Sequence, residues 1–479
     1  MLMNDLLAIL PLLVVIGSAL VVILVDLVIP DQKKWITALL AVVSLAIALG
    51  LTILQPAGGE TAFHGMLRND GFARYLNILF LASGIAGIGL AHGYLKRLGI
   101  ERGEYYMLLL FTLSGMMTMA MAVDLIMVFL GLELLSIPLY VLTGFARPQL
   151  ASEEGSLKYF LLGTFASGFV LFGTAMVFGA TAHTGLAGIL VSIQEGAANP
   201  FLLLIGASLL LVGFGFKVAA VPFHMWTPDV YHGAPSPVTG FMSVGAKAAG
   251  FAALMRVFSL AFSSQSAALV PILWTLAALT MFTGNLLAIP QSNIKRLLAY
   301  SSIAHAGYIL MAFVPYGDAA ITAKAISSGM FYLAIYAITS FGIWAIVTML
   351  EKAEGGGLNL ENFSGMGRKY PLVGVCMLIF LLSFIGIPPL LGFWGKLTLF
   401  RTALEGGYLS LAVVGILTSL LSAYYYLRIV YFMFMRSGEP EIHMDKWAMT
   451  IMVLAAIMIL LLGLLPGLAF SLASVPPLL

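Results

Sequence analysis

Long apolar segments alternate with short polar ones over the whole chain. Each apolar segment holds about 20 residues, which is enough for a helix to cross a hydrocarbon core of ~30 Å. Their spacing predicts about fourteen membrane-spanning helices, at residues 6–28, 35–54, 75–95, 105–122, 124–145, 157–180, 200–221, 236–258, 267–289, 294–314, 321–350, 371–404, 408–434 and 447–470.

The seventh and twelfth of these segments are interrupted. The seventh runs into Pro222 and restarts at the sequence TPD, where Thr227 is expected to cap a new helix and Pro228 to take its first position. The twelfth contains IGIPPLLGFWGK, residues 385–396, with two prolines and three glycines. A membrane tolerates a broken helix only where the freed backbone groups are buried in protein or face water. We therefore expect two discontinuous helices.

Composition places the chain among all-α integral membrane proteins. It is 61% hydrophobic and only 9% charged, whereas soluble domains carry roughly 25% charge. The net charge of +2 gives no reason to expect nucleic acid as a partner. The single cysteine, Cys376, excludes a disulfide framework and a cysteine-ligated iron–sulfur cluster within the chain. The first apolar segment lacks a basic leader and is expected to be a span rather than a signal peptide.

Basic residues in the loops predict the orientation in the membrane. Loops after even-numbered spans carry few of them: Arg68, Arg74 and, at the end of the twelfth span, Arg401. The other loops carry Lys33, Lys34, Lys96, Arg97, Arg102, Arg147, Lys295, Arg296, Lys352, Arg368, Lys369, Arg436 and Lys446. We expect a multi-pass protein of the inner (cytoplasmic) membrane of a bacterium, with both termini on the non-cytoplasmic side.

The interrupted segments also suggest internal symmetry. Spans 4–8 begin at the predicted cytoplasmic face and spans 9–13 at the other, and each block of five has its broken helix in fourth place. Two inverted five-helix repeats are typical of transporters, whose working groups lie near the midplane. The expected units are a three-helix segment (1–100), the first repeat (101–260), the second repeat (261–436) and a C-terminal helix (437–479).

Ionisable side chains within the spans are the candidate functional groups. Each one costs roughly 2.5–3.5 kcal/mol on insertion scales and is a functional hypothesis by default. These residues are Glu133, Lys158, Lys217, Lys247, Lys324 and Lys396, with Arg256 and Arg428 nearer the span ends and His305 as a polar companion. Seven histidines are scattered along the chain without metal-ligand spacing.

Glu133 and Lys217 form the central hypothesis. Burial lowers the pKa of a lysine and a nearby carboxylate raises it again, so a carboxylate that moves would switch the lysine between two protonation states. Two simpler interpretations remain open. The sole role of Glu133 could be to neutralise a lysine during folding, and the Lys217 side chain could reach the cytoplasmic surface.

The other candidates have structural alternatives of the same kind. Lys247 lies among small residues, and its role could be limited to structural pairing with a neighbouring helix. Lys396 follows the second helix break, and Lys217 precedes the first. Lys158 begins the sixth span and could equally reach the surface. Lys324, near the other membrane face, is expected to anchor at the interface. His224 and His305 could relay protons or form structural hydrogen bonds.

Four stretches carry a resemblance to a known family: GLELLSIPLY, VPFHMWTPDVYHGAPSPV, QSNIKRLLAYSSIAHAGY and GIPPLLGFWGK. They resemble the antiporter-like membrane subunits of respiratory complex I, the proton-translocating NADH–quinone oxidoreductase. The form TPDVYHGAP is most like the subunit N branch, the counterpart of mitochondrial subunit 2. The resemblance covers nearly the whole chain.

The resemblance implies a proton channel built on fourteen helices. It makes Glu133 and Lys217 the input pair, Lys247 the connecting lysine and Lys396 the residue of the exit half. It places His224 and His305 along the polar axis. Flavin, iron–sulfur clusters and quinone are implied in partner subunits, with no cofactor, metal or redox centre in this chain. The partners that the resemblance implies are the other membrane and peripheral subunits of complex I, together with the lipid bilayer.

Two other functions remain as alternatives. A secondary sodium/proton antiporter of the multisubunit type shares the fold, but a sodium site should have clustered deep carboxylates and only Glu133 is clearly central. A membrane scaffold would use its buried charges for assembly alone. Replacing the charged residues one at a time separates loss of pumping from loss of assembly.

Overall fold

The computed structural model describes residues 2–30, 33–56, 58–352 and 355–473, and nearly all of them are helical. The first half contains α1 (Leu2–Ala8), α2 (Leu10–Asp26), α3 (Trp35–Leu54), α4 (Gly71–Leu98), α5 (Gly103–Met121), α6 (Leu125–Thr143), α7 (Leu150–Thr181), α8 (Leu186–Gln194), α9 (Pro200–Val218), α10 (Trp226–Gly233) and α11 (Ser236–Ala261). The second half contains α12 (Ser266–Ala288), α13 (Ile294–Phe313), α14 (Ala319–Leu350), α15 (Met366–Lys369), α16 (Pro371–Ile385), α17 (Leu391–Glu405), α18 (Leu409–Met435), α19 (Lys446–Leu464) and α20 (Pro466–Ala473).

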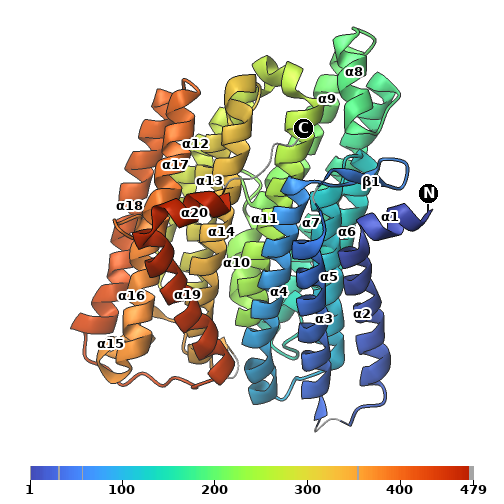
Figure 1. The fold of residues 1–479 in the computed structure, drawn as a ribbon. Coiled ribbons are helices and arrows are strands. Elements are labelled where there is room, and N and C mark those ends of the chain that lie inside the picture. Colours follow the sequence, from blue (N-terminus) through green and yellow to red (C-terminus); the bar gives the residue numbers. More distant parts are fainter. Residues whose placement is uncertain (1, 31–32, 57, 353–354, 474–479) are drawn as a thin grey trace.

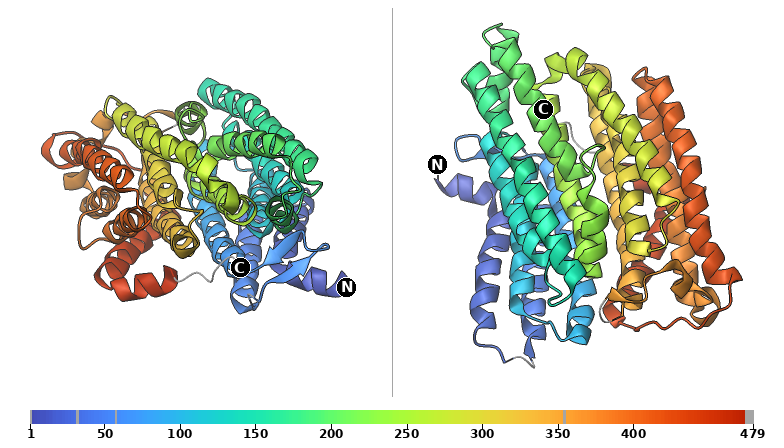
Figure 2. Two further views of the ribbon diagram at one scale, coloured as in Figure 1. Left: turned by 90° about the horizontal axis from the view of Figure 1, so that it is seen from above. Right: turned by 180° about the vertical axis from the view of Figure 1, so that it is seen from behind.

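The long helices run roughly parallel to one another in a single bundle (Figure 1). The N-terminal and C-terminal halves lie side by side, and the view along the helices separates them clearly (Figure 2). The halves meet where α11 packs on α14 and α10 packs on α13. The sequence of α11 explains its central place, because its small residues let neighbouring backbones approach closely, and nearly the whole helix is buried.

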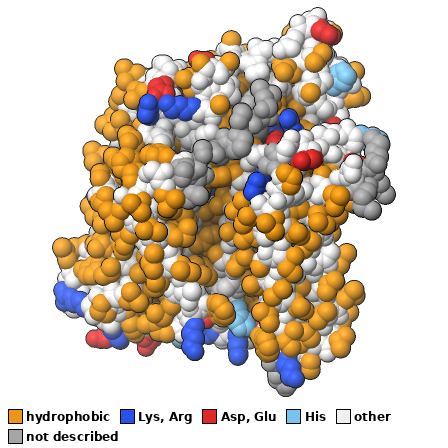
Figure 3. All heavy atoms as spheres, in the orientation of Figure 1, with side chains coloured by type: hydrophobic (Ala, Val, Ile, Leu, Met, Phe, Trp, Pro, Cys, Tyr) orange, Lys and Arg blue, Asp and Glu red, His pale blue; other side chains and the backbone are white. Residues whose placement is uncertain are grey.

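The face of the bundle seen in Figure 3 is apolar over most of its height, and most of its charged side chains lie toward the two ends. Ten helices of the described chain are long and apolar enough to cross a membrane. Exposed leucine, isoleucine and phenylalanine side chains on such helices are expected where the solvent is lipid. The chain is therefore a multi-pass membrane protein, and helices overlap each predicted apolar segment.

Two local predictions differ from the structure. The all-α prediction missed a short antiparallel hairpin, β1 (Glu60–Ala62) with β2 (Leu67–Asn69), whose turn includes Gly65 at φ +83°. The first apolar segment is divided into α1 and α2 rather than being one helix. Short elements of this kind carry too few residues for a periodic pattern to reveal them.

A second glycine, Gly115, allows α5 and α6 to pack closely. A Cβ on Gly115 would overlap the backbone nitrogen of Leu135, and the carbonyl of Gly131 would be only 2.7 Å from it. A backbone atom cannot rotate away as a side chain can, so the two helices would have to separate.

We expect Gly115→Ala to lower the free energy of unfolding by roughly 1–3 kcal/mol, the usual range for overpacking. Thermal unfolding of the purified protein measures this. Gly168→Ala is the matched control, because a Cβ on Gly168 of α7 meets nothing within 4 Å. Equal melting temperatures for the two variants would contradict the proposed close packing.

Candidate functional site

The first helix break places Lys217 at the end of α9. Ala219 adopts a left-handed conformation (φ +63°) directly after the helix. The turn that follows is held by protein partners: the Trp226 indole donates to the Phe216 carbonyl at 3.1 Å, and the Val221 amide donates to Thr280 Oγ1 at 2.9 Å. The freed backbone is thus partly satisfied inside the bundle, as a break at membrane depth requires.

The predicted restart of this helix at Thr227 is wrong. The helix α10 begins at Trp226, and its N-cap is Met225 without a side-chain cap. The Thr227 hydroxyl is buried and has no hydrogen-bond partner in the described ranges. The reason is that the Thr227 amide already bonds to the His224 carbonyl at 2.9 Å. The turn after Pro222 therefore leads the backbone into the helix before the TPD sequence is reached.

Lys217 is buried, with 4% of its surface exposed, and contacts hydroxyl groups. Its amine donates to Ser136 Oγ at 2.8 Å and makes a longer contact of 3.5 Å with the Tyr159 hydroxyl. The amine also lies 5.7 Å from the centre of the Tyr159 ring. Ser136 belongs to α6 and Tyr159 to α7, so three helices of the first half meet at this lysine.

Glu133 lies one turn before Ser136 on α6, on the same helix face. It is half-buried, and its Oε1 atom is buried with no hydrogen-bond partner among the residues that the structure describes. Glu133 is close enough to Lys217 for an electrostatic interaction. Among the described residues the two do not form an ion pair within 4.0 Å. The structure therefore brings the predicted pair to one site, with Ser136 as the direct partner of the lysine.

Lys247 continues the site toward the second half. It is 3% exposed, and its amine donates to the Ser302 carbonyl at 2.6 Å and to Ser302 Oγ at 2.9 Å. Gly250 is one turn further along α11, and a Cβ there would lie 3.1 Å from Cγ of Lys217. Residues three apart share a helix face. The Lys217 side chain, which comes from α9, therefore packs on the face of α11 that carries Lys247, one turn further along.

His305 lies one turn after Ser302 on α13. Its Nδ1 atom is 2.7 Å from the Tyr332 hydroxyl and its Nε2 atom is 3.0 Å from the Tyr426 hydroxyl. The ring also interacts electrostatically with Lys247 and Lys396. His305 thus stands between the two lysines.

Lys396 sits at the second helix break. Its amine donates to the Ile385 carbonyl, which the end of α16 leaves free, at 3.0 Å, and to Ser419 Oγ at 2.6 Å. It also lies 5.1 Å from the centre of the Tyr308 ring, one turn after His305. Gly386 makes this approach possible, since its φ is +91° and a Cβ there would lie 3.0 Å from Cδ of Lys396.

These contacts define a polar row through the bundle, which we name by its four ionisable members: Lys217, Lys247, His305 and Lys396. The row passes from α9 through α11 and α13 to α17. Each member is buried and bonded to a hydroxyl of a serine or tyrosine. Hydroxyls can donate and accept, so the arrangement suits the transfer of protons.

Two predicted residues lie outside the polar row. Lys158 is 41% exposed and forms ion pairs with Glu154 at 2.6 Å and Asp229 at 2.8 Å. His224 follows the first break, and within the described part of the chain its buried Nδ1 atom has no hydrogen-bond partner. Lys324, expected to be an interfacial anchor, forms an ion pair with Glu405 on the surface.

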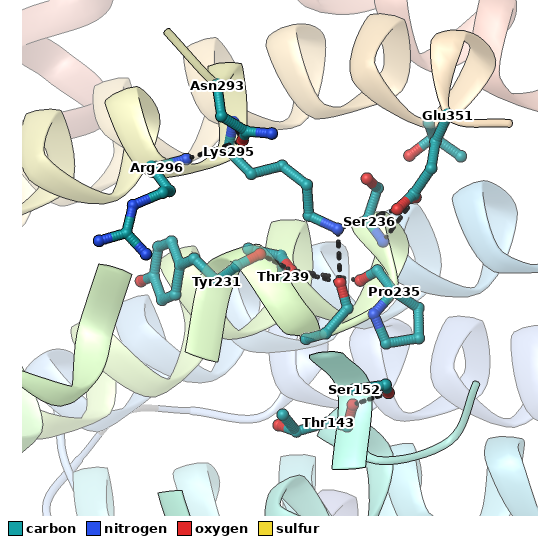
Figure 4. Close-up of polar contacts among 12 residues, drawn as sticks. Thr143, Ser152, Tyr231, Pro235, Ser236, Thr239, Asn293, Lys295, Arg296 and Glu351 are labelled. Carbon is teal, nitrogen blue, oxygen red and sulfur yellow. Dashed lines mark hydrogen bonds and ion pairs between the residues drawn. The ribbon is translucent and has the colours of Figure 1, made fainter. Parts of the chain in front are cut away.

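Sequence reasoning missed several charged residues that lie outside the row. Lys295 was assigned to a loop, but it is buried in the first turn of α13, where it pairs with Glu351 at 2.9 Å and donates to the Ala234 carbonyl at 2.6 Å (Figure 4). Asp229 on α10 joins Lys158 to Arg296, which it contacts at 2.8 Å. The signal for Lys295 was Asn293, whose side chain caps α13 and so starts the helix before the lysine.

A second buried ion pair joins the start of α4 to α11. Arg256 of α11 is fully buried and donates to both carboxylate oxygens of Asp70, each at 2.7 Å. Asp70 is also the N-cap of α4, where it accepts from the Ala73 amide at 2.9 Å. Phe72 covers the guanidinium at 4.6 Å. The pair fixes α4 against α11.

No group of three or more His, Cys, Asp or Glu side chains that could hold a metal ion occurs in the described part of the chain. The ionisable groups of the site are instead spread along the polar row, one on each helix.

Comparison with known proteins gives consistent matches. Residues 122–422 match the family model for the membrane region of NADH:quinone oxidoreductase and Mrp antiporters. NADH-quinone oxidoreductase subunit N of Chloroflexus aggregans is 44% identical over 478 residues, covering 98% of this chain and 96% of that protein. A chain of respiratory complex I from Thermus thermophilus with bound aureothin is 36% identical with a TM-score of 0.82, covering 96% of this chain and 98% of that chain. A chain of the Mrp complex from Dietzia sp. DQ12-45-1b is 19% identical with a TM-score of 0.84, covering 99% of this chain and 96% of that chain, a likeness of fold alone.

Proposed function

The chain belongs to the NADH:quinone oxidoreductase/Mrp antiporter family of membrane proteins, and from this premise we propose that it is the proton-translocating subunit N of an NADH-quinone oxidoreductase. It moves protons across the membrane while the redox chemistry takes place in other subunits. Flavin, iron–sulfur clusters and quinone belong to those partners in this proposal. The chain itself breaks and forms only bonds to protons.

The observation that carries the proposal is the continuity of the polar row. Lys217, Lys247, His305 and Lys396 are all nine-tenths buried or more. Each is linked to the next through one turn of helix: Lys217 packs on α11 at Gly250, Lys247 bonds to Ser302 before His305, and Lys396 contacts Tyr308 after His305. Ionisable groups at such depth are expensive and mark ion or proton pathways. A purely structural set of buried charges would be expected to form ion pairs, whereas the amines of this row bond to neutral groups.

The chemistry follows from the preferences of a buried amine. A lysine away from water favours its neutral form, and a carboxylate that approaches favours the protonated form. Glu133 on α6 is the movable counter-charge in this proposal. When its carboxylate is near, the Lys217 amine takes up a proton, and when it withdraws, the proton passes toward Lys247.

The second half of the row completes the transfer. Lys247 receives the proton and hands it to His305, whose two ring nitrogens allow it to accept at one side and donate at the other. Lys396 is the last ionisable group, held at the second break by the Ile385 carbonyl. Lys158, paired with Asp229, and His224, beside the first break, belong to the approach to the row.

The finer architecture is part of the same proposal. We assign fourteen membrane spans, two inverted five-helix repeats and the four units 1–100, 101–260, 261–436 and 437–479. The breaks between α9 and α10 and between α16 and α17 support this assignment. Both termini lie on the non-cytoplasmic side of a bacterial inner membrane, next to the other membrane and peripheral subunits of the complex.

Lys247→Met tests the proposal in the assembled enzyme. We expect NADH-driven proton pumping to fall at least about tenfold, since the loss of one positioned proton carrier typically costs 10²–10⁴-fold in a transfer step. Proton uptake by membrane vesicles measures the effect, and the yield of assembled complex is measured alongside it. Lys369→Met is the matched control, because this lysine pairs with Glu439 on the surface. Normal pumping by Lys247→Met would contradict the proposal, and loss of assembly without a specific loss of pumping would favour a scaffold.

The likeness of fold to a chain of an Mrp complex keeps one alternative, a secondary sodium/proton antiporter subunit. We expect the purified chain in vesicles to give no sodium-dependent proton flux, because Glu133 is the only carboxylate beside the row among the described residues. A sodium gradient across the vesicle membrane and a pH-sensitive dye inside measure this. Flux that follows the sodium gradient would favour the antiporter.

A further inference from the structure

A small cavity lies beside Lys217, between α6, α7 and α9. Its volume is about 10 Å³, which is room for about one water molecule. The polar side chains that line it are Ser136, Tyr140, Ser167 and Lys217, and the remaining lining is apolar or glycine. A buried water needs two to four polar partners, so the lining is sufficient to hold one.

Ser167 has a buried hydroxyl that the protein leaves unsatisfied. Its residue is 5% exposed, and Oγ has no hydrogen-bond partner among the described residues. The threonine hydroxyls of α7 donate to carbonyls of their own helix, as Thr164 does to Phe160 and Thr174 to Val170. A buried polar group without a partner carries a desolvation penalty that a bound water removes. The Ser167 hydroxyl has no such bond, and its residue lines the cavity.

The Lys217 amine also has room for one more partner. A protonated lysine has three N–H donors, and its protein acceptors here are Ser136 Oγ and, at the longer distance, the Tyr159 hydroxyl. The Ser136 hydroxyl donates its own hydrogen to the Leu132 carbonyl at 2.5 Å. Ser136 is therefore a fixed acceptor for the lysine, and the third N–H is left for the cavity.

We propose that one water molecule binds in this cavity between Ser167 Oγ and Lys217 Nζ, and that Ser167 is a positioning residue for Lys217. The water completes the set of acceptors around the protonated amine. It thereby holds the amine on the α6 side of the row, next to Glu133, until the proton moves on. The importance of this position rests on the proposed function, whereas the water site itself does not.

Three variants of the assembled enzyme test the proposal. Ser167→Val removes the hydroxyl and fills the cavity with methyl groups, Ser167→Thr keeps the hydroxyl, and Thr174→Val is the matched control on the same helix. We expect Ser167→Val to lower NADH-driven proton pumping about fivefold, the rate equivalent of one lost hydrogen bond. Ser167→Thr and Thr174→Val should pump at the wild-type rate.

The solvent isotope effect distinguishes positioning from simple structural damage. If Lys217 is mispositioned, proton transfer becomes slower relative to the other steps, so the deuterium isotope effect on pumping by Ser167→Val should rise. Structural damage would lower the amount of active enzyme and leave that ratio unchanged. A high-resolution map of the wild-type complex should contain density for a water within about 3.2 Å of Ser167 Oγ.

Two results would overturn the proposal: a map without that water, or pumping and isotope effects for Ser167→Val equal to those of Thr174→Val. Lys217→Met separates this failure from failure of the proposed function. If Lys217→Met stops pumping while Ser167→Val does not, only the water site is wrong. If neither variant changes pumping, the proton pathway through Lys217 is wrong as well.

Discussion

Lys217→Met is expected to reduce NADH-driven proton pumping by the assembled enzyme at least about tenfold. The methionine side chain is as long as the apolar stem of lysine, so the packing against Gly250 is retained while the amine is lost. The contact with Ser136 disappears, and Glu133 has no amine to load. Initial rates of proton uptake in inverted membrane vesicles, divided by the amount of assembled complex, measure the effect.

Lys217→Arg is the informative companion variant. A guanidinium stays protonated at all working pH values, so this variant preserves the charge and abolishes the switch. We expect assembly to survive and pumping to fall as far as in Lys217→Met. Pumping close to that of the wild type in both variants would mean that the proton path does not pass through the first helix break.

Asp70→Asn is expected to lower the free energy of unfolding by about 3–5 kcal/mol, the largest effect on stability that we foresee. The substitution removes the charge that faces the fully buried Arg256, and the guanidinium is left without a counter-charge. Removing one partner of a buried pair costs far more than the pair contributes, because the other charge remains out of water. Thermal and denaturant unfolding of the purified protein measure the change.

The double variant Asp70→Asn with Arg256→Met is the control. It removes both charges and leaves two neutral side chains in the same space, so we expect it to be more stable than Asp70→Asn alone. With Arg256→Met measured as well, the effect of the double variant minus the effects of the two single variants gives the coupling energy. If the double variant were less stable than the wild type by the sum of the two single effects, the pair would not interact.

The helices could be predicted from the sequence, and so could the burial of Lys217, Lys247, His305 and Lys396. A lysine within an apolar segment such as Lys247 has few structural explanations, and its burial follows from its position on α11. The helix breaks were equally visible, since Pro222 and the prolines between α16 and α17 cannot continue a helix with full hydrogen bonding. The restart of the first break was misplaced because a cap signal at Thr227 is weaker than the turn that precedes it.

Partners were much harder to predict than positions. Lys217 bonds to Ser136, which is 81 residues away, and Lys247 bonds to Ser302, 55 residues away. Serine is common in membrane helices, so nothing in the sequence marks these two as ligands for an amine. Lys295 was misplaced for a related reason: its counter-charge, Glu351, is 56 residues away and reaches it only through the packing of α14 beside α13.

The tyrosine hydroxyls around His305 have a consequence for the direction of transport. Each hydroxyl can donate or accept, and one lies at each ring nitrogen. When a proton reaches one hydroxyl, that hydroxyl can give its own hydrogen to the facing ring nitrogen while the other nitrogen releases its hydrogen to the second hydroxyl, so the imidazole changes tautomer with no movement of a helix. Proton transfer through His305 therefore has no preferred direction. The direction of transport must then be set at the ends of the row, by the counter-charge of Lys217 and by the outlet beyond Lys396.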